Sequence, residues 1–342
     1  MRPSFFLHLH PPSIPAQQAR WRYTLGAGGI SVLLSGVVLL SGIFLTFYYS
    51  PSVESAAVSV QRITYLVPLG WIVRGLHFWS AQALVVFASV HLLRVVMTGA
   101  YPSRRFNYLL GLGLFVLILL LDFSGYVLRW DEGIHWALVV GTNLLKTIPL
   151  GGSYLYGFVV GAEQPSAPTL LRFYGWHLFG LMLPFIFLTG WHLFRLRRDS
   201  GLVVPPPALR REIARIKRFE LVRREVFATL VVLSILLLWV AFFPVPIAAP
   251  ILENSSLAGD TSAPWFFLWV QGLLRFGDPF WFGIVIPAAF LTLLALIPYI
   301  LGEPHPDELG RWFPKSGRRA QILFLSLFAL WLGLTITALR VK

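Results

Sequence analysis

Long stretches of apolar residues dominate the chain, and the shorter segments between them hold most of the charged residues. A helix that crosses the hydrocarbon core of a membrane needs about 20 apolar residues, because each residue advances it by about 1.5 Å. Stretches of this length, nearly free of charge, occur at 28–49, 75–98, 108–128, 173–194, 226–247, 280–301 and 320–339. The pattern predicts an all-α, polytopic membrane protein with seven transmembrane helices.

Composition supports this prediction and changes the meaning of the charge. Of the 342 residues, 56% are hydrophobic and 13% are charged, which is too apolar for a soluble domain. A net charge of +13 would suggest nucleic acid in a soluble protein, but here the basic residues collect on one side of the predicted helices. We therefore expect no nucleic-acid partner, a cytoplasmic N-terminus and an external C-terminus. The residues on the cytoplasmic side are Arg2, Arg20, Arg22, Arg104, Arg105, the basic positions of 195–224, Arg311, Lys315, Arg318 and Arg319.

The chain is predicted to divide at a proline-rich, strongly basic segment. Residues 1–200 should form a four-helix bundle with an interfacial external loop, in which 131–145 is a helix along the membrane surface. Residues 201–225 are a basic cytoplasmic linker beside anionic lipid. Residues 226–342 are a three-helix part. The absence of cysteine excludes disulfides, iron–sulfur clusters held by this chain and thioether-linked haem.

Four histidines in the predicted helices repeat at matched intervals. His77 and His91 are 14 residues apart, so they lie within about 40° of one helix face and about 21 Å apart along the axis. His177 and His192 are 15 residues apart, which gives about 60° and about 22 Å. Two such helices side by side would offer two stacked pairs of imidazoles.

Paired imidazoles across a helix bundle are suitable axial ligands for haem iron. We expect two non-covalent, bis-histidine haems of the electron-transfer type, held by His77 with His177 and by His91 with His192. A binuclear metal centre is disfavoured, because its metals lie about 4 Å apart and these ligands do not. The alternatives are hydrogen-bonded packing residues or a proton path in a haem-free helical transporter.

Glycines repeat at the same interval in the two neighbouring helices. Gly28 and Gly42 are separated by as many positions as His77 and His91, and so are Gly111 and Gly125. Because glycine in a helix costs about 1 kcal/mol relative to alanine, such pairs suggest close approach by a bulky group. The simpler alternative is helix packing through small residues.

Arginines lie within a few residues of every histidine of the pairs. Arg74 and Arg172 precede one pair, while Arg94 and Arg195 follow the other. They are candidates to bind haem propionates, with Arg74 and Arg172 preferred, or else they anchor helix ends at the interface.

Asp122 lies at membrane depth, where an unpaired charge is costly. Its carboxyl group therefore either makes a buried structural hydrogen bond, which is the favoured interpretation, or takes part in the deprotonation of a substrate.

Four motifs together resemble a known family. TFYYSP at 46–51, WIVRGLHFWSA at 71–81, GYVLRW at 125–130 and LRFYGWH at 171–177 resemble cytochrome b of the Rieske–cytochrome b complexes. The resemblance covers 28–194, and the longer interval between His177 and His192 is closer to the plastid-type bf complexes. Residues from about 225 onward resemble the three-helix subunit of those complexes, here fused to the four-helix part.

The resemblance implies an electron-transport role in a prokaryotic cytoplasmic membrane, with proton translocation. It implies a Rieske iron–sulfur protein and a c-type cytochrome or other acceptor as partners, quinone as substrate, and a homodimeric assembly. His77 and His177 match the haem ligands near the outer quinol-oxidation site, and His91 and His192 match those near the inner quinone site. The four glycines match those that pack against the macrocycles. Arg197 matches an inner-site arginine, and Thr24 replaces the cysteine that tethers an extra haem.

The outer site departs from the family pattern. The family's Pro-Glu-Trp-Tyr is replaced by 263–266, which reads Ala-Pro-Trp-Phe, so the glutamate that accepts a quinol proton is missing. Leu-Pro-Trp is likewise altered at 128–130, and no acidic residue precedes Glu54. Candidate outer-site residues are Trp265, Phe266, Tyr126, Asp122 and Asp260, with Glu253, Asp131 and His135 as further proton acceptors. The altered site leaves open a haem-b anchor that exchanges electrons between quinone and an external partner.

Overall fold

The computed structural model describes residues 11–206, 214–251 and 263–340. Within these residues, seven helices are long and apolar enough to cross a membrane, which confirms the predicted number. Their bounds are α3 (Ala27–Thr46), α5 (Gly70–Met97), α6 (Arg105–Val127), α9 (Ala167–Gly175) continuing through η3 (Trp176–Leu181) into α10 (Met182–Arg198), α11 (Arg218–Phe242), η6 (Trp281–Val285) continuing into α13 (Ile286–Ile300), and α14 (Arg318–Arg340).

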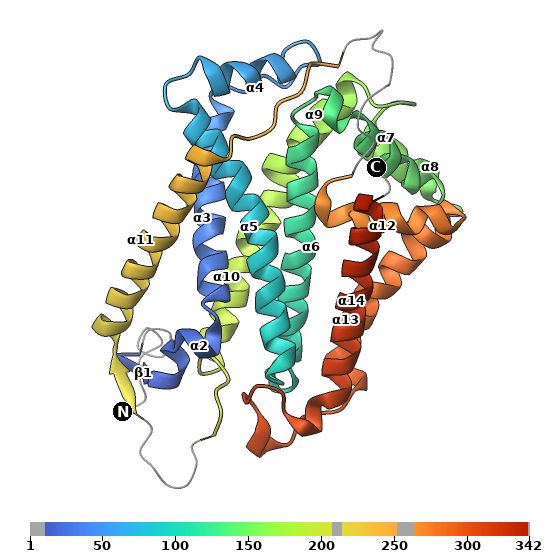
Figure 1. Ribbon diagram of the computed structural model, residues 1–342. Helices are drawn as coiled ribbons and strands as arrows, with labels where there is room; N and C mark the ends of the chain where they lie inside the picture. Colours follow the sequence, from blue (N-terminus) through green and yellow to red (C-terminus); the bar gives the residue numbers. More distant parts are fainter. Residues whose placement is uncertain (1–10, 207–213, 252–262, 341–342) are drawn as a thin grey trace.

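The centre of the molecule is a bundle formed by α3, α5, α6 and α10 (Figure 1). Helix α3 packs along α5, and α6 packs on both α5 and α10. The apolar surface between them is filled by a cluster that includes Leu34, Leu84 and Ile118, all of which are buried. Each histidine-bearing helix therefore packs on a glycine-bearing helix: α5 packs on both α3 and α6, and the continuous helix η3–α10 packs on α6.

The three C-terminal spanning helices lie on two sides of this bundle (Figure 1). Helix α11 packs on α5 and α3, and a side chain at Gly75 would collide with Val240 of α11. Helices α13 and α14 pack instead on the side of α6 and α5, where Tyr108 donates a hydrogen bond to the Leu294 carbonyl. The segment expected to be a three-helix part is thus split by the bundle in space.

Short helices cover the end of the bundle that is uppermost in Figure 1, called the upper end below. The predicted surface helix is present as α7, which begins at Glu132 after Asp131. Its carboxylate-rich start is held in place, because Asp131 pairs with Arg129 at 2.6 Å and the Glu132 amide donates to the Ala249 carbonyl. The other elements here are α4 (Ala56–Tyr65), α8 (Gly152–Val160), η4 (Trp265–Phe267), α12 (Leu268–Leu273) and η5 (Leu274–Phe276).

The lower end joins the N-terminal segment to the basic linker. Strand β1 (Ser13–Pro15) pairs antiparallel with β2 (Arg215–Lys217). The Tyr23 hydroxyl donates to the Val203 carbonyl, and burial raises the pKa of this phenol, so it remains a donor. Helix α11 begins at Arg218, within the segment 201–225 that was predicted to be the basic linker. The remaining short elements are η1 (Ala16–Ala19), α2 (Trp21–Thr24), η2 (Pro102–Arg104), η7 (Pro306–Glu308) and η8 (Lys315–Gly317).

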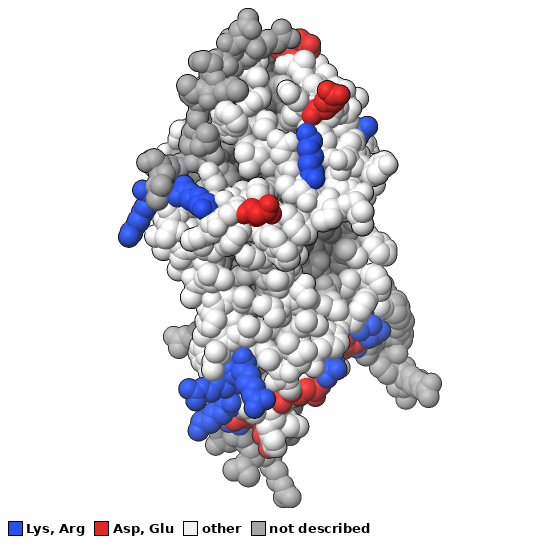
Figure 2. All heavy atoms as spheres, turned by 90° about the vertical axis from the view of Figure 1, so that its right-hand side faces the viewer, with Lys and Arg blue, Asp and Glu red and all other residues white. Residues whose placement is uncertain are grey.

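Most of the charged residues lie at the two ends of the molecule, and Asp122 within α6 is an exception. Figure 2 shows a broad band without Lys, Arg, Asp or Glu between them, with many basic side chains gathered at the lower end. Arg311, Lys315, Arg318 and Arg319 in the loop before α14 and at its start are all exposed. This distribution suits a protein whose middle faces lipid and whose two ends face water.

Candidate functional site

The structure brings the four histidines together in the two pairs expected from their spacing. The ring centroids of His77 and His177, the upper pair, are 6.3 Å apart. Those of His91 and His192, the lower pair, are 6.5 Å apart. A metal bound to both rings, with nitrogens at about 2 Å and centroids about 1.1 Å behind them, requires a separation of about 6.2 Å. Both pairs have the spacing of axial ligands on one metal.

The second ring nitrogen of each upper histidine is held by a neighbouring helix. Nδ1 of His77 lies 3.0 Å from the Val38 carbonyl and 3.2 Å from the Ser41 hydroxyl of α3. Nδ1 of His177 lies 2.9 Å from the Ser124 hydroxyl of α6. When Nδ1–H donates a hydrogen bond to an oxygen atom, Nε2 is left without a proton and is free to bind a metal. The upper pair is therefore oriented as metal ligands usually are.

Each histidine lies against one of the four glycines on the adjacent helix. A Cβ atom added at Gly42 would lie 2.9 Å from Cε1 of His77, and one at Gly125 would lie 2.9 Å from Cε1 of His177. At the lower pair the corresponding distances are 3.0 Å for Gly28 with His91 and 3.3 Å for Gly111 with His192. The glycines thus give room for the imidazoles, whose Nε2 atoms lie farther from the glycines than Cε1.

A π-helical turn explains why the two intervals differ by one residue. The segment η3, which contains His177, is π-helical, whereas α5 is α-helical throughout. A π-turn accommodates one extra residue within a helix that otherwise keeps its direction. The longer interval from His177 to His192 therefore covers the same rotation as the shorter interval in α5. An ideal α-helix would instead place these two histidines about 60° apart around the helix axis.

The arginines nearest the upper pair are engaged by the protein itself. The Arg74 guanidinium donates to Thr64 and to the carbonyls of Val245 and Pro246. Arg172 donates to two carbonyls at the end of α8. These bonds do not support the expected preference for Arg74 and Arg172 as propionate-binding residues.

The arginines nearest the lower pair keep unused donors. Arg94 is 3% exposed and lies over the ring of Tyr23, while Arg195 lies over the ring of Phe106. The buried Nε atoms of both arginines have no hydrogen-bond partner within the described part of the chain. A buried, unpaired guanidinium nitrogen is costly, so these atoms suit an anionic group such as a haem propionate.

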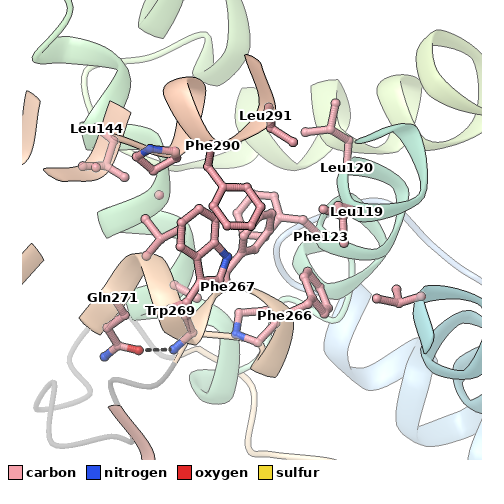
Figure 3. Close-up of a pocket in the computed structure, with 18 of the residues that line it drawn as sticks. Leu119, Leu120, Phe123, Leu144, Phe266, Phe267, Trp269, Gln271, Phe290 and Leu291 are labelled. Carbon is pink, nitrogen blue, oxygen red and sulfur yellow. Dashed lines mark hydrogen bonds between the residues drawn. The ribbon is translucent and has the colours of Figure 1, made fainter. Parts of the chain in front are cut away.

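A large apolar cavity of about 790 Å³ lies between the bundle and the helices α12, α13 and α14, and it extends from Trp265 and Phe266 at the upper end to Leu92 and Leu93 in the lower half of α5. Figure 3 shows aromatic side chains, including Phe123, Phe267, Trp269 and Phe290, gathered around it. Among the predicted outer-site residues, Trp265 and Phe266 line the cavity. None of its described lining residues carries an ionisable side chain, so its walls recognise shape and apolar surface.

The other predicted quinone-site residues that the structure describes lie outside the cavity wall. Tyr126 donates to the Gly133 carbonyl. Asp122 accepts two hydrogen bonds from Gln82, whose carbonyl accepts one from Trp265. His135 lines a separate crevice between α7 and α8. Arg197 is exposed near the end of α10, and Asp260 and Glu253 lie outside the described residues.

Sequence reasoning missed three polar side chains that organise the site. Ser41 and Ser124 contact Nδ1 of the upper histidines, and Gln82 connects Asp122 to Trp265. Ser124 directly precedes Gly125, and Ser41 precedes Gly42. A Ser-Gly pair in each glycine-bearing helix was therefore the available signal, as was an amide at membrane depth in the case of Gln82.

The fold and the site define a polytopic membrane protein with two stacked pairs of facing histidines in a four-helix bundle. The described residues hold no group of three or more His, Asp or Glu that could bind a bare metal ion. Two protein ligands per metal suit an iron whose other ligands come from a porphyrin.

Comparison with known proteins identifies the family. The family model described as "Cytochrome b/b6/petB" matches residues 14–200. "Cytochrome b6" of Heliomicrobium gestii is 39% identical over 174 residues, which are 50% of this chain and 80% of that protein. The "Menaquinol:cytochrome c reductase cytochrome b subunit" of Geobacillus thermodenitrificans is 36% identical over 175 residues, which are 51% of this chain and 78% of that protein.

The fold has a counterpart over nearly the whole chain. The solved structure "Hyperthermophilic respiratory Complex III" has a TM-score of 0.71 and 20% identity, and the match covers 93% of this chain and 92% of that one. This chain therefore belongs to the cytochrome b family, which implies binding of b-type haem and quinone and a role in electron transfer.

Replacement of Gly125 by leucine is expected to abolish haem binding at the upper pair. The new side chain would begin 2.9 Å from the His177 ring and push it off the metal axis. Gly113→Leu on the same helix is the matched control, because nothing lies within 4 Å of its Cβ position. Both changes favour helix formation, so only the collision differs. Haem content per chain measures the effect, and a Gly125→Leu protein with full haem content would contradict it.

Proposed function

We propose that this chain is the di-haem cytochrome b subunit of a quinol:cytochrome c, or similar acceptor, oxidoreductase. It carries electrons from quinol oxidised at the outer side to a quinone site at the inner side, coupled to proton translocation. The upper end corresponds to the outer side, with the N-terminus cytoplasmic and the C-terminus external in a prokaryotic cytoplasmic membrane. A Rieske iron–sulfur protein and a c-type cytochrome or other acceptor complete the assembly, which is a homodimer.

The observation that supports this proposal most strongly is the two stacked histidine pairs. Each pair has the ring separation of axial ligands, and the pairs lie about 21 Å apart along α5. Haem held between the two histidines of a pair would supply a one-electron redox centre suited to electron transfer. The histidines position that centre, and the helices α3 and α6 fix the histidine rings.

The outer quinol site is proposed to be the apolar cavity lined by Trp265 and Phe266. Its aromatic walls suit a quinone ring and its length along α5 and α6 suits an isoprenoid tail. The basic lower end, where Arg197 lies, is proposed as the side of quinone reduction. The division at 1–200, 201–225 and 226–342 is retained as a proposal, and the family match at 14–200 supports its first part.

The purified complex is expected to show bis-histidine b-type absorbance and rapid haem reduction by menadiol, a short naphthoquinol. Haem reduction should be fast only when the Rieske partner is oxidised, because a bifurcating outer site delivers the two electrons of quinol to different acceptors. An inhibitor that occupies the cavity should then abolish the reduction of haem by menadiol. Haem-free protein would overturn the proposal and leave the helical transporter as the alternative.

A second candidate is a haem-b anchor that exchanges electrons between quinone and an external partner without bifurcation. The cavity favours this candidate in one respect, since none of its described lining residues can accept a quinol proton. In the same experiment, such an anchor would reduce its haems equally fast whether the Rieske centre is reduced, oxidised or absent.

A further inference from the structure

Three polar side chains from different elements form a continuous row of hydrogen bonds beside the apolar cavity. Nε2 of Gln82 on α5 lies 2.9 and 3.0 Å from the two carboxylate oxygens of Asp122 on α6. Nε1 of Trp265, at the start of η4, lies 2.7 Å from Oε1 of Gln82. The row thus connects the haem-bearing bundle to the segment that carries the altered 263–266 motif.

The chemistry of the three groups fixes their orientation. An indole N–H can only donate, so Gln82 must present its carbonyl oxygen to Trp265 and its NH₂ group to Asp122. A carboxylate accepts from that NH₂ group and therefore opposes a flip of the amide. A flipped amide would face the indole N–H with another donor and leave both unpaired at membrane depth, which is costly.

The last member of the row forms part of the cavity wall. Trp265 lines the cavity together with Phe266 and Trp331, and its ring meets both of these rings at steep angles. Gln82 and Asp122 do not line the cavity. A displaced Trp265 indole would therefore change the shape of the cavity although the amide and the carboxylate never touch its contents.

We propose that Asp122 and Gln82 are positioning residues that hold the Trp265 indole in the wall of the outer quinol cavity and thereby set its affinity for the quinol ring. This proposal rests on the proposed function, because it assigns the cavity to quinol. It explains how a site without the usual glutamate keeps a defined wall: the acidic group lies behind the tryptophan and acts through an amide.

The row argues against Asp122 as the direct proton acceptor. Between the carboxylate and the cavity lie an amide N–H group and an indole N–H group, neither of which exchanges protons readily at neutral pH. The hydrogen bonds all point toward Asp122, so the row stabilises an acceptor and offers no relay from the cavity.

The test compares Q82L, D122L and D122N in the complex isolated from membranes, with menadiol as the reductant. Q82L and D122L remove the row, so the apparent KM for menadiol is expected to rise about five-fold, which is about the factor that one net hydrogen bond contributes. The maximal rate should fall much less. D122N keeps an oxygen that accepts from Gln82, so it should restore most of the affinity lost in D122L.

Two further variants separate this role from general damage to the helices. Thr292→Ala removes a side-chain hydrogen bond to the Ala288 carbonyl in α13, away from the row, and should leave KM unchanged. Adding Q82L to W265F should raise KM no further than W265F alone, because the indole N–H is already absent.

Several results would overturn the proposal. If D122N loses as much affinity for menadiol as D122L does, the effect depends on the charge or the proton of Asp122 and not on its hydrogen bond to Gln82. If Q82L binds menadiol normally, the row has no effect on the cavity. If the wild-type complex holds haem but is not reduced by menadiol, the proposed function fails instead. In that case, the binding of menadione can still be followed through the haem spectrum without turnover. Its affinity would then distinguish Q82L and D122L from the wild-type complex.

Discussion

His91→Ala is expected to lose the lower haem and keep the upper one, so that about half of the b-type absorbance remains. The His91 ring faces His192 at 6.5 Å, and alanine leaves only one ligand for that iron. The upper pair should be unaffected, because His77 and its partners on α3 lie about four helical turns away along α5. Electron transfer from quinol to the lower side should fall below detection.

Haem content and the reduced-minus-oxidised spectrum of the purified protein measure this loss. His135→Ala is the matched control, since His135 belongs to α7 and to neither pair. A His91→Ala protein with two intact bis-histidine spectra would refute the ligand assignment.

Deletion of Phe179 is expected to leave both haems in place, although it removes a residue between two proposed ligands. Phe179 lies in the π-turn η3 and is 62% exposed. The deletion should convert the π-turn to α-helix and make the interval from His177 to His192 equal to the interval from His77 to His91 in α5. Two haems per chain, with slightly shifted spectra, are the expected result.

Deletion of Val86 is the matched control for the π-turn. Val86 is also exposed and apolar and lies between His77 and His91, but α5 has no π-turn to absorb the change. The deletion rotates one histidine by about 100° relative to the other, so one haem should be lost. If both deletions lose a haem, the π-turn does not compensate for the extra residue.

The sequence by itself determined the spanning helices and the histidine pairing. Apolar stretches of membrane length locate the helices, because a chain in lipid must satisfy its backbone hydrogen bonds within each helix. Helix periodicity alone then places His77 and His91 on one face of their helix, and Gly28 and Gly42 on one face of theirs. The structure brings each glycine against its histidine. These features are local, and periodicity is the strongest local signal that a sequence carries.

Only the tertiary structure decided what lies between the helices. The position of α11 apart from α13 and α14, the carbonyl partners of Arg74, and the cavity bounded by Trp265 and Phe266 all depend on contacts between distant segments. The start of α11 at Arg218 and the π-turn around His177 also differ from what the regular apolar pattern predicted. Side-chain hydrogen bonds such as the row from Asp122 through Gln82 to Trp265 join three elements. The spacing of residues along one helix does not predict such bonds, because their partners come from segments that are far apart in the sequence and meet only in the folded protein.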